Sequence, residues 1–69
     1  MNDKIRITLE AARVNAKMTQ AQAAKELGVS VTSIVKWENG TSVPGVDKAL
    51  ALARLYSMPV DNIIFCPEG

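Results

Sequence analysis

The stretch from Thr19 to Gly40, TQAQAAKELGVSVTSIVKWENG, constrains the fold of this chain more than any other segment. Its pattern predicts two short helices joined by a turn. Thr19 is a favourable N-cap, and Gln22 three residues later completes the T-x-x-Q pattern of a capping box. Gly28 comes where the first helix should end, because glycine tolerates the positive φ of a helix C-terminus. Ser30 can then cap the second helix, which we expect to end at Gly40.

The two predicted helices differ in the faces that they turn toward a core. In the first, one face of mostly small and apolar side chains recurs at helical spacing: Gln20, Ala23, Ala24 and Leu27. In the second, Ile34 and Trp37 share one face. The other side chains of that helix have no obvious place in a core: Val31, Thr32, Val35 and Lys36. A short helix-turn-helix with such an outward face on its second helix has the geometry that fits the DNA major groove.

The flanking segments predict three further helices. The first runs from about Ile5 to Lys17, and another runs from about Pro44 or Gly45 to Tyr56, with Pro44 suited to its first turn. A short last helix is expected from about Pro59 to Phe65. No segment alternates between apolar and polar residues for long enough to predict a sheet. The expected fold is therefore all-α with five helices.

Composition bounds the domain count and excludes several classes of protein. The 69 residues are 48% hydrophobic, so we expect one domain, residues 1–69, with a small core to which a partner subunit could add stability. No run is long enough to span a membrane, and the charged start MNDKIRITLE is unlike a signal peptide. The single cysteine, Cys66, excludes an internal disulfide and suits a reducing cytosol.

Charge and side-chain chemistry limit the function further. The net charge is +1, so the chain is not a polycation that coats nucleic acid. Residues 1–18 contain four basic and two acidic residues, whereas residues 43–69 contain two basic and three acidic ones. This distribution supports a basic surface near the N-terminal end, but a neutral domain can also be solvated with no partner.

Catalytic and metal-binding constellations are missing from the sequence. There is no histidine base, no nucleophile with a partner and no glycine-rich phosphate loop. One cysteine and no histidine also exclude a four-ligand zinc site. We therefore expect no enzyme, no metal, no cofactor and no small-molecule ligand.

The helix-turn-helix pattern is similar to that of a known protein family. The chain resembles the Cro and lambda-repressor-like (XRE-type) regulators of bacteria and phages. The matching residues are Thr19-Gln20, Ala24, Leu27-Gly28-Val29-Ser30, Ile34 and Trp37-Glu38-Asn39-Gly40, with Arg13, Pro44, Ala53, Val60 and Ile63-Ile64 outside the helix-turn-helix. The combination is fairly specific, because independent elements match at fixed offsets. Two positions depart: Ala23 stands where the family often has leucine, and Val31 where it usually has a polar residue.

The resemblance implies a five-helix lambda-repressor-like domain with its helix-turn-helix at about residues 19–40. It also implies sequence-specific binding of double-stranded DNA by a cytoplasmic, nucleoid-associated transcriptional regulator, a repressor of phage or mobile-element type. A different class stays open, a protein-interaction module such as an antitoxin-like protein. The near-zero net charge and the apolar last helix favour that alternative.

Candidate DNA contacts lie along the outer side of the helix-turn-helix. The resemblance implies that the Gln20 amide donates to a phosphate at a helix N-terminus, although it could be a solvated first-turn residue. On the second helix, Val31 could contact a thymine methyl, Thr32 a base or phosphate, and Lys36 guanine or a phosphate. A plain surface helix is the alternative. Flanking residues could hold phosphates or form caps and turns: Ser30, Ser33, Asn39, Thr41 and Ser42.

The resemblance also implies an ion pair and a homodimer. Arg13 of the first helix should meet Glu38 in a partly buried pair that fixes two helices together. One recognition helix reads too few base pairs to single out a site, and members of this family usually pair on two half-sites. We expect a two-fold homodimer on an inverted-repeat operator. Its interface would use apolar residues that a short last helix cannot bury: Val60, Ile63, Ile64 and Phe65.

Overall fold

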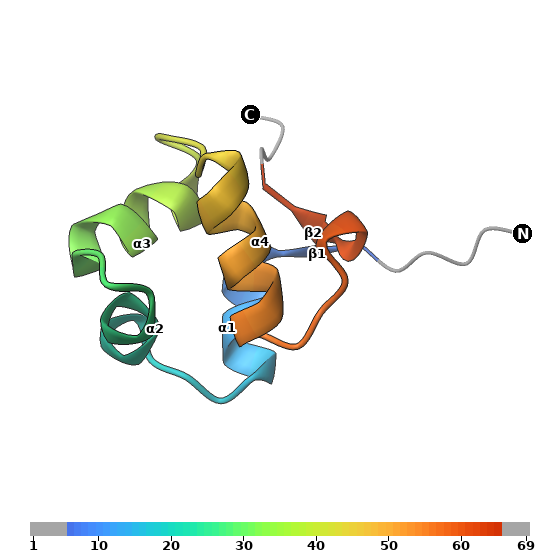
Figure 1. Cartoon of the computed structure of the whole chain (residues 1–69), viewed down its shortest axis with the longest axis horizontal. Helices are drawn as coiled ribbons and strands as arrows, with labels where there is room; N and C mark the ends of the chain where they lie inside the picture. The colour runs from blue at the N-terminus through green and yellow to red at the C-terminus, as the bar shows by residue number, and fades with distance from the viewer. Residues whose placement is uncertain (1–5, 66–69) are drawn as a thin grey trace, which may run out of the picture.

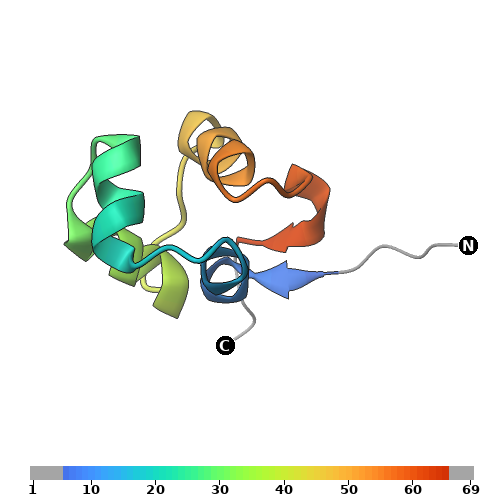
Figure 2. The same ribbon diagram turned by 90° about the horizontal axis from the view of Figure 1, so that it is seen from below.

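The computed structural model describes residues 6–65. Its elements follow in the order β1 (Ile7–Thr8), α1 (Leu9–Asn15), α2 (Gln20–Leu27), α3 (Val31–Asn39), α4 (Val46–Leu55), the 3-10 helix η1 (Val60–Asn62) and β2 (Ile63–Ile64). In Figure 1, α2 and α3 form one side of the molecule, α1 and α4 its centre, and the two strands the other side. The view from below in Figure 2 separates α4 from α1 and shows β1 beside β2.

The local structure of the helix-turn-helix confirms the predicted caps. The Thr19 hydroxyl accepts a hydrogen bond from the Gln22 backbone N–H at 3.0 Å, and the Gln22 side chain accepts one from the Thr19 backbone N–H at 2.8 Å. The Ser30 hydroxyl accepts from the Ser33 N–H at 3.2 Å. Gly28 and Gly40 end α2 and α3 with φ of 72° and 81°, the left-handed conformation that glycine adopts at low cost.

A small core holds the four α-helices together. Its buried hydrophobic residues are Leu9, Ala12, Ala23, Ala24, Ile34, Leu52, Ala53, Tyr56 and Ile63. The two buried alanines of α2, Ala23 and Ala24, let that helix contact both α3 and α4, because small side chains allow a close approach. Trp37 packs against the same core while partly buried, as its shared face with Ile34 predicts.

The expectation of five helices is wrong, because the described residues form four α-helices, and the first of these is shorter than predicted. The first helix begins at Leu9 rather than at about Ile5. Ile5 lies outside the described residues, and so does Cys66. Thr8 is extended (φ −75°, ψ 163°), and its hydroxyl accepts the Ala11 N–H at 3.1 Å. A residue that caps a helix has non-helical backbone angles, so the residues before Leu9 are free to form a strand.

The last predicted helix is a single 3-10 turn followed by strand β2. The two short strands are parallel, with Ile7 opposite Ile63 and Thr8 opposite Ile64. β-branched residues suit a pleated strand, and the pairing places Ile63 in the core at 5% exposure. The expectation of no sheet is therefore also wrong: the part of the chain that the structure describes has four α-helices and this two-stranded sheet.

The fourth α-helix begins later than predicted. Gly45 is its N-cap and Val46 its first residue, so Pro44 precedes the helix and is buried instead of standing in the first turn. The C-terminal end agrees with the prediction, since α4 ends at Leu55 and Tyr56 is its C-cap. Within residues 6–65, no helix is both long and apolar enough to pass through a membrane.

Candidate nucleic-acid interface

Helix α3 keeps one face on the core and the other in solvent. Ile34 is 1% exposed, whereas Val31 and Val35 are 42% and 36% exposed. Thr32 and Lys36 are also exposed, and Ser33 is half-buried. The structure thus places the predicted outward side chains on one surface of α3. Their arrangement leaves methyl, hydroxyl and ammonium groups available to a ligand that lies along the helix.

The small polar residues at the ends of α3 are occupied in local hydrogen bonds. The Ser30 hydroxyl caps the helix and lies 3.2 Å from the Ser33 hydroxyl. At the other end, the Asn39 side-chain carbonyl accepts from the Thr41 backbone N–H at 2.9 Å and from its hydroxyl at 2.6 Å. Ser42 is exposed. These bonds fix the two ends of α3, and all these residues except Ser33 remain exposed beside it.

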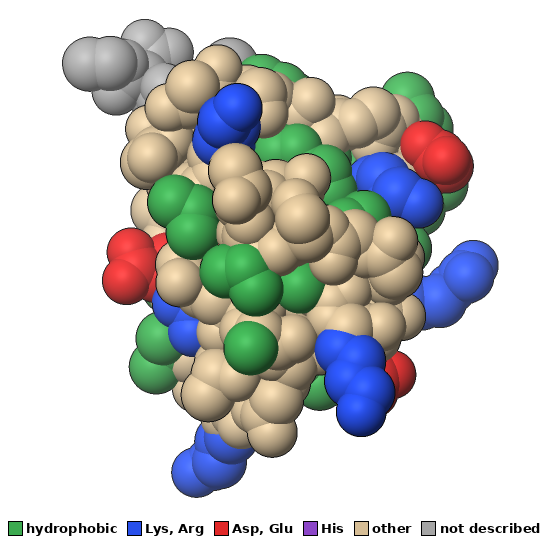
Figure 3. Space-filling view, turned by 90° about the vertical axis from the view of Figure 1, so that its left-hand side faces the viewer, with side chains coloured by type: hydrophobic (Ala, Val, Ile, Leu, Met, Phe, Trp, Pro, Cys, Tyr) green, Lys and Arg blue, Asp and Glu red, His purple; other side chains and the backbone are tan. Residues whose placement is uncertain are grey.

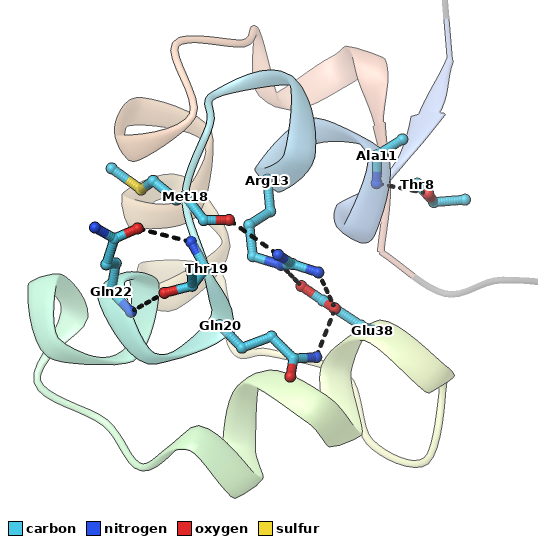
Figure 4. Close-up of polar contacts among 8 residues, drawn as sticks. All are labelled: Thr8, Ala11, Arg13, Met18, Thr19, Gln20, Gln22 and Glu38. Carbon is cyan, nitrogen blue, oxygen red and sulfur yellow. Dashed lines mark hydrogen bonds and ion pairs between the residues drawn. The ribbon is translucent and has the colours of Figure 1, made fainter.

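A polar cluster behind this surface joins three helices. Arg13 donates from Nε to Glu38 Oε2 at 2.7 Å, from Nη2 to Glu38 Oε1 at 3.3 Å, and from Nη1 to the Met18 carbonyl at 2.9 Å (Figure 4). The side chains of Arg13 and Glu38 are 12% and 7% exposed. The hydrogen bond to Glu38 raises the pKa of the Arg13 guanidinium. The structure therefore holds α1, the link to α2, and the end of α3 through one ion pair.

Gln20 belongs to the same cluster, which the sequence alone did not reveal. Its Nε2 donates to Glu38 Oε1 at 3.1 Å, and its side chain reaches across from the start of α2 (Figure 4). A side-chain amide has two N–H donors, and this bond uses one. Gln20 is half-buried. The contact depends on how α2 crosses α3, for which the sequence carries no local signal.

The apolar residues expected at a dimer interface are more buried than predicted. Ile63 lies in the core, and Val60, Ile64 and Phe65 are half-buried. The sequence predicts that some of them are exposed in the monomer, but the segment forms a turn and a strand that pack on the core and leave three of the four half-buried. The large apolar side chains with the greatest exposure lie elsewhere: Val46 at 78%, Val14 at 58%, Val43 at 53% and Leu50 at 46%.

The face formed by α2 and α3 has a mixed surface. Seen from that side, Lys and Arg side chains are spread around its margin, with hydrophobic side chains between them and few acidic ones (Figure 3). α3 has one acidic residue, Glu38, and it is paired with Arg13. Among residues 6–65, no group of three metal-ligating side chains comes together.

Comparison with known families decides the classification. The sequence model of the family described as Helix-turn-helix matches residues 9–63. This chain belongs to the helix-turn-helix family. The match runs from the start of α1 to β2, so the helix-turn-helix domain includes the whole α-helical core and not α2 and α3 alone.

Curated relatives of this helix-turn-helix domain are regulators. It is 32% identical over 56 residues to the HTH-type transcriptional activator BcrR of Enterococcus faecalis, covering 81% of this chain and 28% of that protein. It is 33% identical over 60 residues to the cryptic phage CTXphi transcriptional repressor RstR of Vibrio cholerae, covering 87% of this chain and 54% of that protein.

A third relative, the uncharacterized HTH-type transcriptional regulator YobD of Bacillus subtilis, is 38% identical over 48 residues, covering 70% of this chain and 43% of that protein. The chain thus spans between about a quarter and about half the length of these relatives. No solved structure gave a significant match.

Proposed function

We propose that this chain binds specific sequences of double-stranded DNA and regulates transcription in the bacterial cytoplasm. The observation that carries the proposal is the outward face of α3, where Val31, Thr32 and Lys36 are exposed on a helix that Ile34 anchors in the core. A recognition helix of a helix-turn-helix uses such side chains near its N-terminus to contact base edges. Family membership and the regulator names of the relatives support it.

The candidate contacts divide between bases and phosphates. Thr32 and Lys36 would donate to base edges, because both can reach acceptors in the major groove. Gln20 would use its second amide N–H on a phosphate, while Glu38 holds its first. The small polar residues around α3 would contact phosphates on either side of the groove: Ser30, Ser33, Asn39, Thr41 and Ser42.

The proposed regulation is repression by occupying an operator that overlaps a promoter. Of the three relatives, RstR is the one whose length the match covers most, at 54%, and it is named as a phage repressor. Repression of this kind requires only that the bound domain exclude the polymerase.

We propose further that two copies bind an inverted repeat whose half-sites lie about one helical turn, roughly 34 Å, apart. Ile63 is buried in the core, so this proposal leaves it out of the interface. Ile64 and Phe65 could contribute their partly exposed surface, but Val46 and Leu50 offer more, since they lie one turn apart on α4 and are 78% and 46% exposed. An isologous pairing would cover the same stripe on both copies.

Selection from random duplex DNA, read by sequencing, tests the function. We expect one enriched motif with two-fold symmetry, and an affinity for it that falls steeply as salt rises, because phosphate contacts release counterions. Enrichment of no motif, together with an affinity for duplex that does not depend on salt, would favour the protein-interaction alternative.

A further inference from the structure

Two valines on the outer face of α3 are partly exposed and lie outside the hydrophobic core. Val31 and Val35 lie one helical turn apart and are 42% and 36% exposed, while Ile34 between them is 1% exposed. Valine loses side-chain freedom in a helix, so its helix propensity is lower than that of alanine. Exposed valines at these positions therefore contribute little to stability, and a ligand for them has to offer apolar surface.

A polar stripe runs beside the valine pair. Thr32 and Lys36 are exposed and also lie one turn apart, each one residue after a valine. The outer face of α3 thus has an apolar row next to a row of hydrogen-bond donors. The major groove presents one apolar group on its base edges, the C5-methyl of thymine, among acceptors and donors on every base pair. The valine row therefore matches the thymine methyl groups, and the polar row matches the hydrogen-bonding groups of the base edges.

We propose that Val31 and Val35 recognise thymine C5-methyl groups, so that each half-site contains thymines next to the base that Thr32 and Lys36 contact. This inference rests on the proposed DNA-binding function and names the base feature that the site reads. Four residues advance an α-helix by about 6 Å, and successive base pairs lie about 3.4 Å apart along the DNA axis. The valine pair therefore spans one to two base-pair steps, enough to reach methyl groups on separate base pairs.

A protein partner explains the valine pair less well. A stable protein–protein interface buries roughly 800 Å² on each side, far more than two partly exposed valines provide. The polar row beside them would also require matching acceptors on that partner, whereas guanine supplies two acceptors at its groove edge.

Replacement of thymine by deoxyuridine tests the proposal, because deoxyuridine lacks the methyl group and keeps the Watson–Crick pairing. Each thymine of the selected operator is replaced in turn, and affinity is measured for the wild-type chain, Val31→Ala and Val35→Ala. We expect the wild type to lose about fourfold for each methyl that a valine covers, the effect of one buried carbon. Each alanine variant should lose the sensitivity at its own thymine.

Val14→Ala is the matched control, since Val14 is an α1 valine that is 58% exposed and lies outside α3. It should keep the full sensitivity to deoxyuridine. Sequence-selective binding that tolerates deoxyuridine at every thymine would overturn the methyl readout and leave the DNA-binding function standing. Equal sensitivity in the wild type and both alanine variants would overturn it too, because the methyl would then act through other residues. Failure to enrich any motif would instead count against the proposed function itself.

Discussion

Arg13 and Glu38 are 25 residues apart in the chain, and their side chains meet with 2.7 Å between Nε and Oε2. Glu38 accepts hydrogen bonds from two Arg13 nitrogens and from Gln20. The pair is mostly shielded from solvent, so each charge depends on the other for the interactions that water would otherwise provide. It fixes the end of α3 against α1, and so sets the position of the helix proposed to bind DNA.

Glu38→Ala should destabilise the fold, because it leaves the shielded Arg13 charge without its partner. The expected cost is about 3 kcal/mol if the charge stays buried, and less if the side chain turns out to solvent. Thermal or denaturant melts of Glu38→Ala, Arg13→Ala and the double variant form the measurement. The coupling between the two sites should exceed about 0.5 kcal/mol, and a strictly additive cycle would show that the side chains do not interact.

The parts of the fold that local chemistry determines could be predicted from the sequence. The capping box of Thr19 and Gln22 and the glycine at the end of α2 involve residues within a few positions of each other. Strands β1 and β2 could not be predicted, because two residues are too few to show an alternating pattern. Their pairing joins the two ends of the domain, which no local signal indicates.

The candidate site likewise has a part that local sequence patterns predict and a part that depends on how the helices pack. Helical spacing placed Ile34 in the core and the other face of α3 in solvent, as the structure has it. The contact between Gln20 and Glu38 depends on the crossing of two helices, and the burial of Ile63 depends on a strand that the sequence did not predict. The DNA contacts themselves stay a prediction, which the following experiments address.

Gln20→Ala should weaken binding to all duplexes by a similar factor. The reason is the proposed phosphate contact, which positions the protein without reading a base. The variant also loses the hydrogen bond to the Glu38 carboxylate, worth about 1.5–3 kcal/mol of stability, so a melt must show that it remains folded at the assay temperature. Affinity for the selected operator and for random DNA is the measurement. A loss confined to one base pair would assign Gln20 to base readout instead.

Lys36→Ala and Thr32→Ala should change base preference. Both side chains are exposed on the outer face of α3, and a direct base contact is worth about 1–3 kcal/mol on the cognate site. Affinities for operators with each base pair varied in turn will show whether preference relaxes at one position. Lys25→Ala, an exposed lysine on α2, serves as the comparison and should leave base preference intact. Equal losses on specific and random DNA would mean that Lys36 and Thr32 contact the backbone.

Val46→Asp should prevent the proposed pairing on DNA. A carboxylate at this exposed position costs the monomer little, whereas two copies brought together by two-fold symmetry would bury like charges near each other. Sedimentation on the selected duplex should change from two protomers to one. Val14→Asp is the control, because it adds the same charge at an exposed valine of α1. Two bound protomers with Val46→Asp would exclude this stripe of α4 from the interface.

Stability should fall in alkaline solution through Tyr56. Burial and the nearby Glu38 carboxylate, partly opposed by Arg13, together raise the pKa of the Tyr56 hydroxyl to about 12. The side chain is 3% exposed, and an unfolded tyrosine titrates near pH 10.

Because the folded state keeps the proton of Tyr56 to a higher pH than the unfolded chain does, the contribution of Tyr56 to stability is complete below about pH 10 and is lost as the pH rises toward about 12. The difference of about two pKa units corresponds to roughly 3 kcal/mol. Denaturant melts from pH 8 to 12 should therefore show a steeper loss for the wild type than for Tyr56→Phe, which has no hydroxyl to ionise at this position. Parallel curves for the two proteins would show that Tyr56 ionises as easily in the folded state as in the unfolded chain.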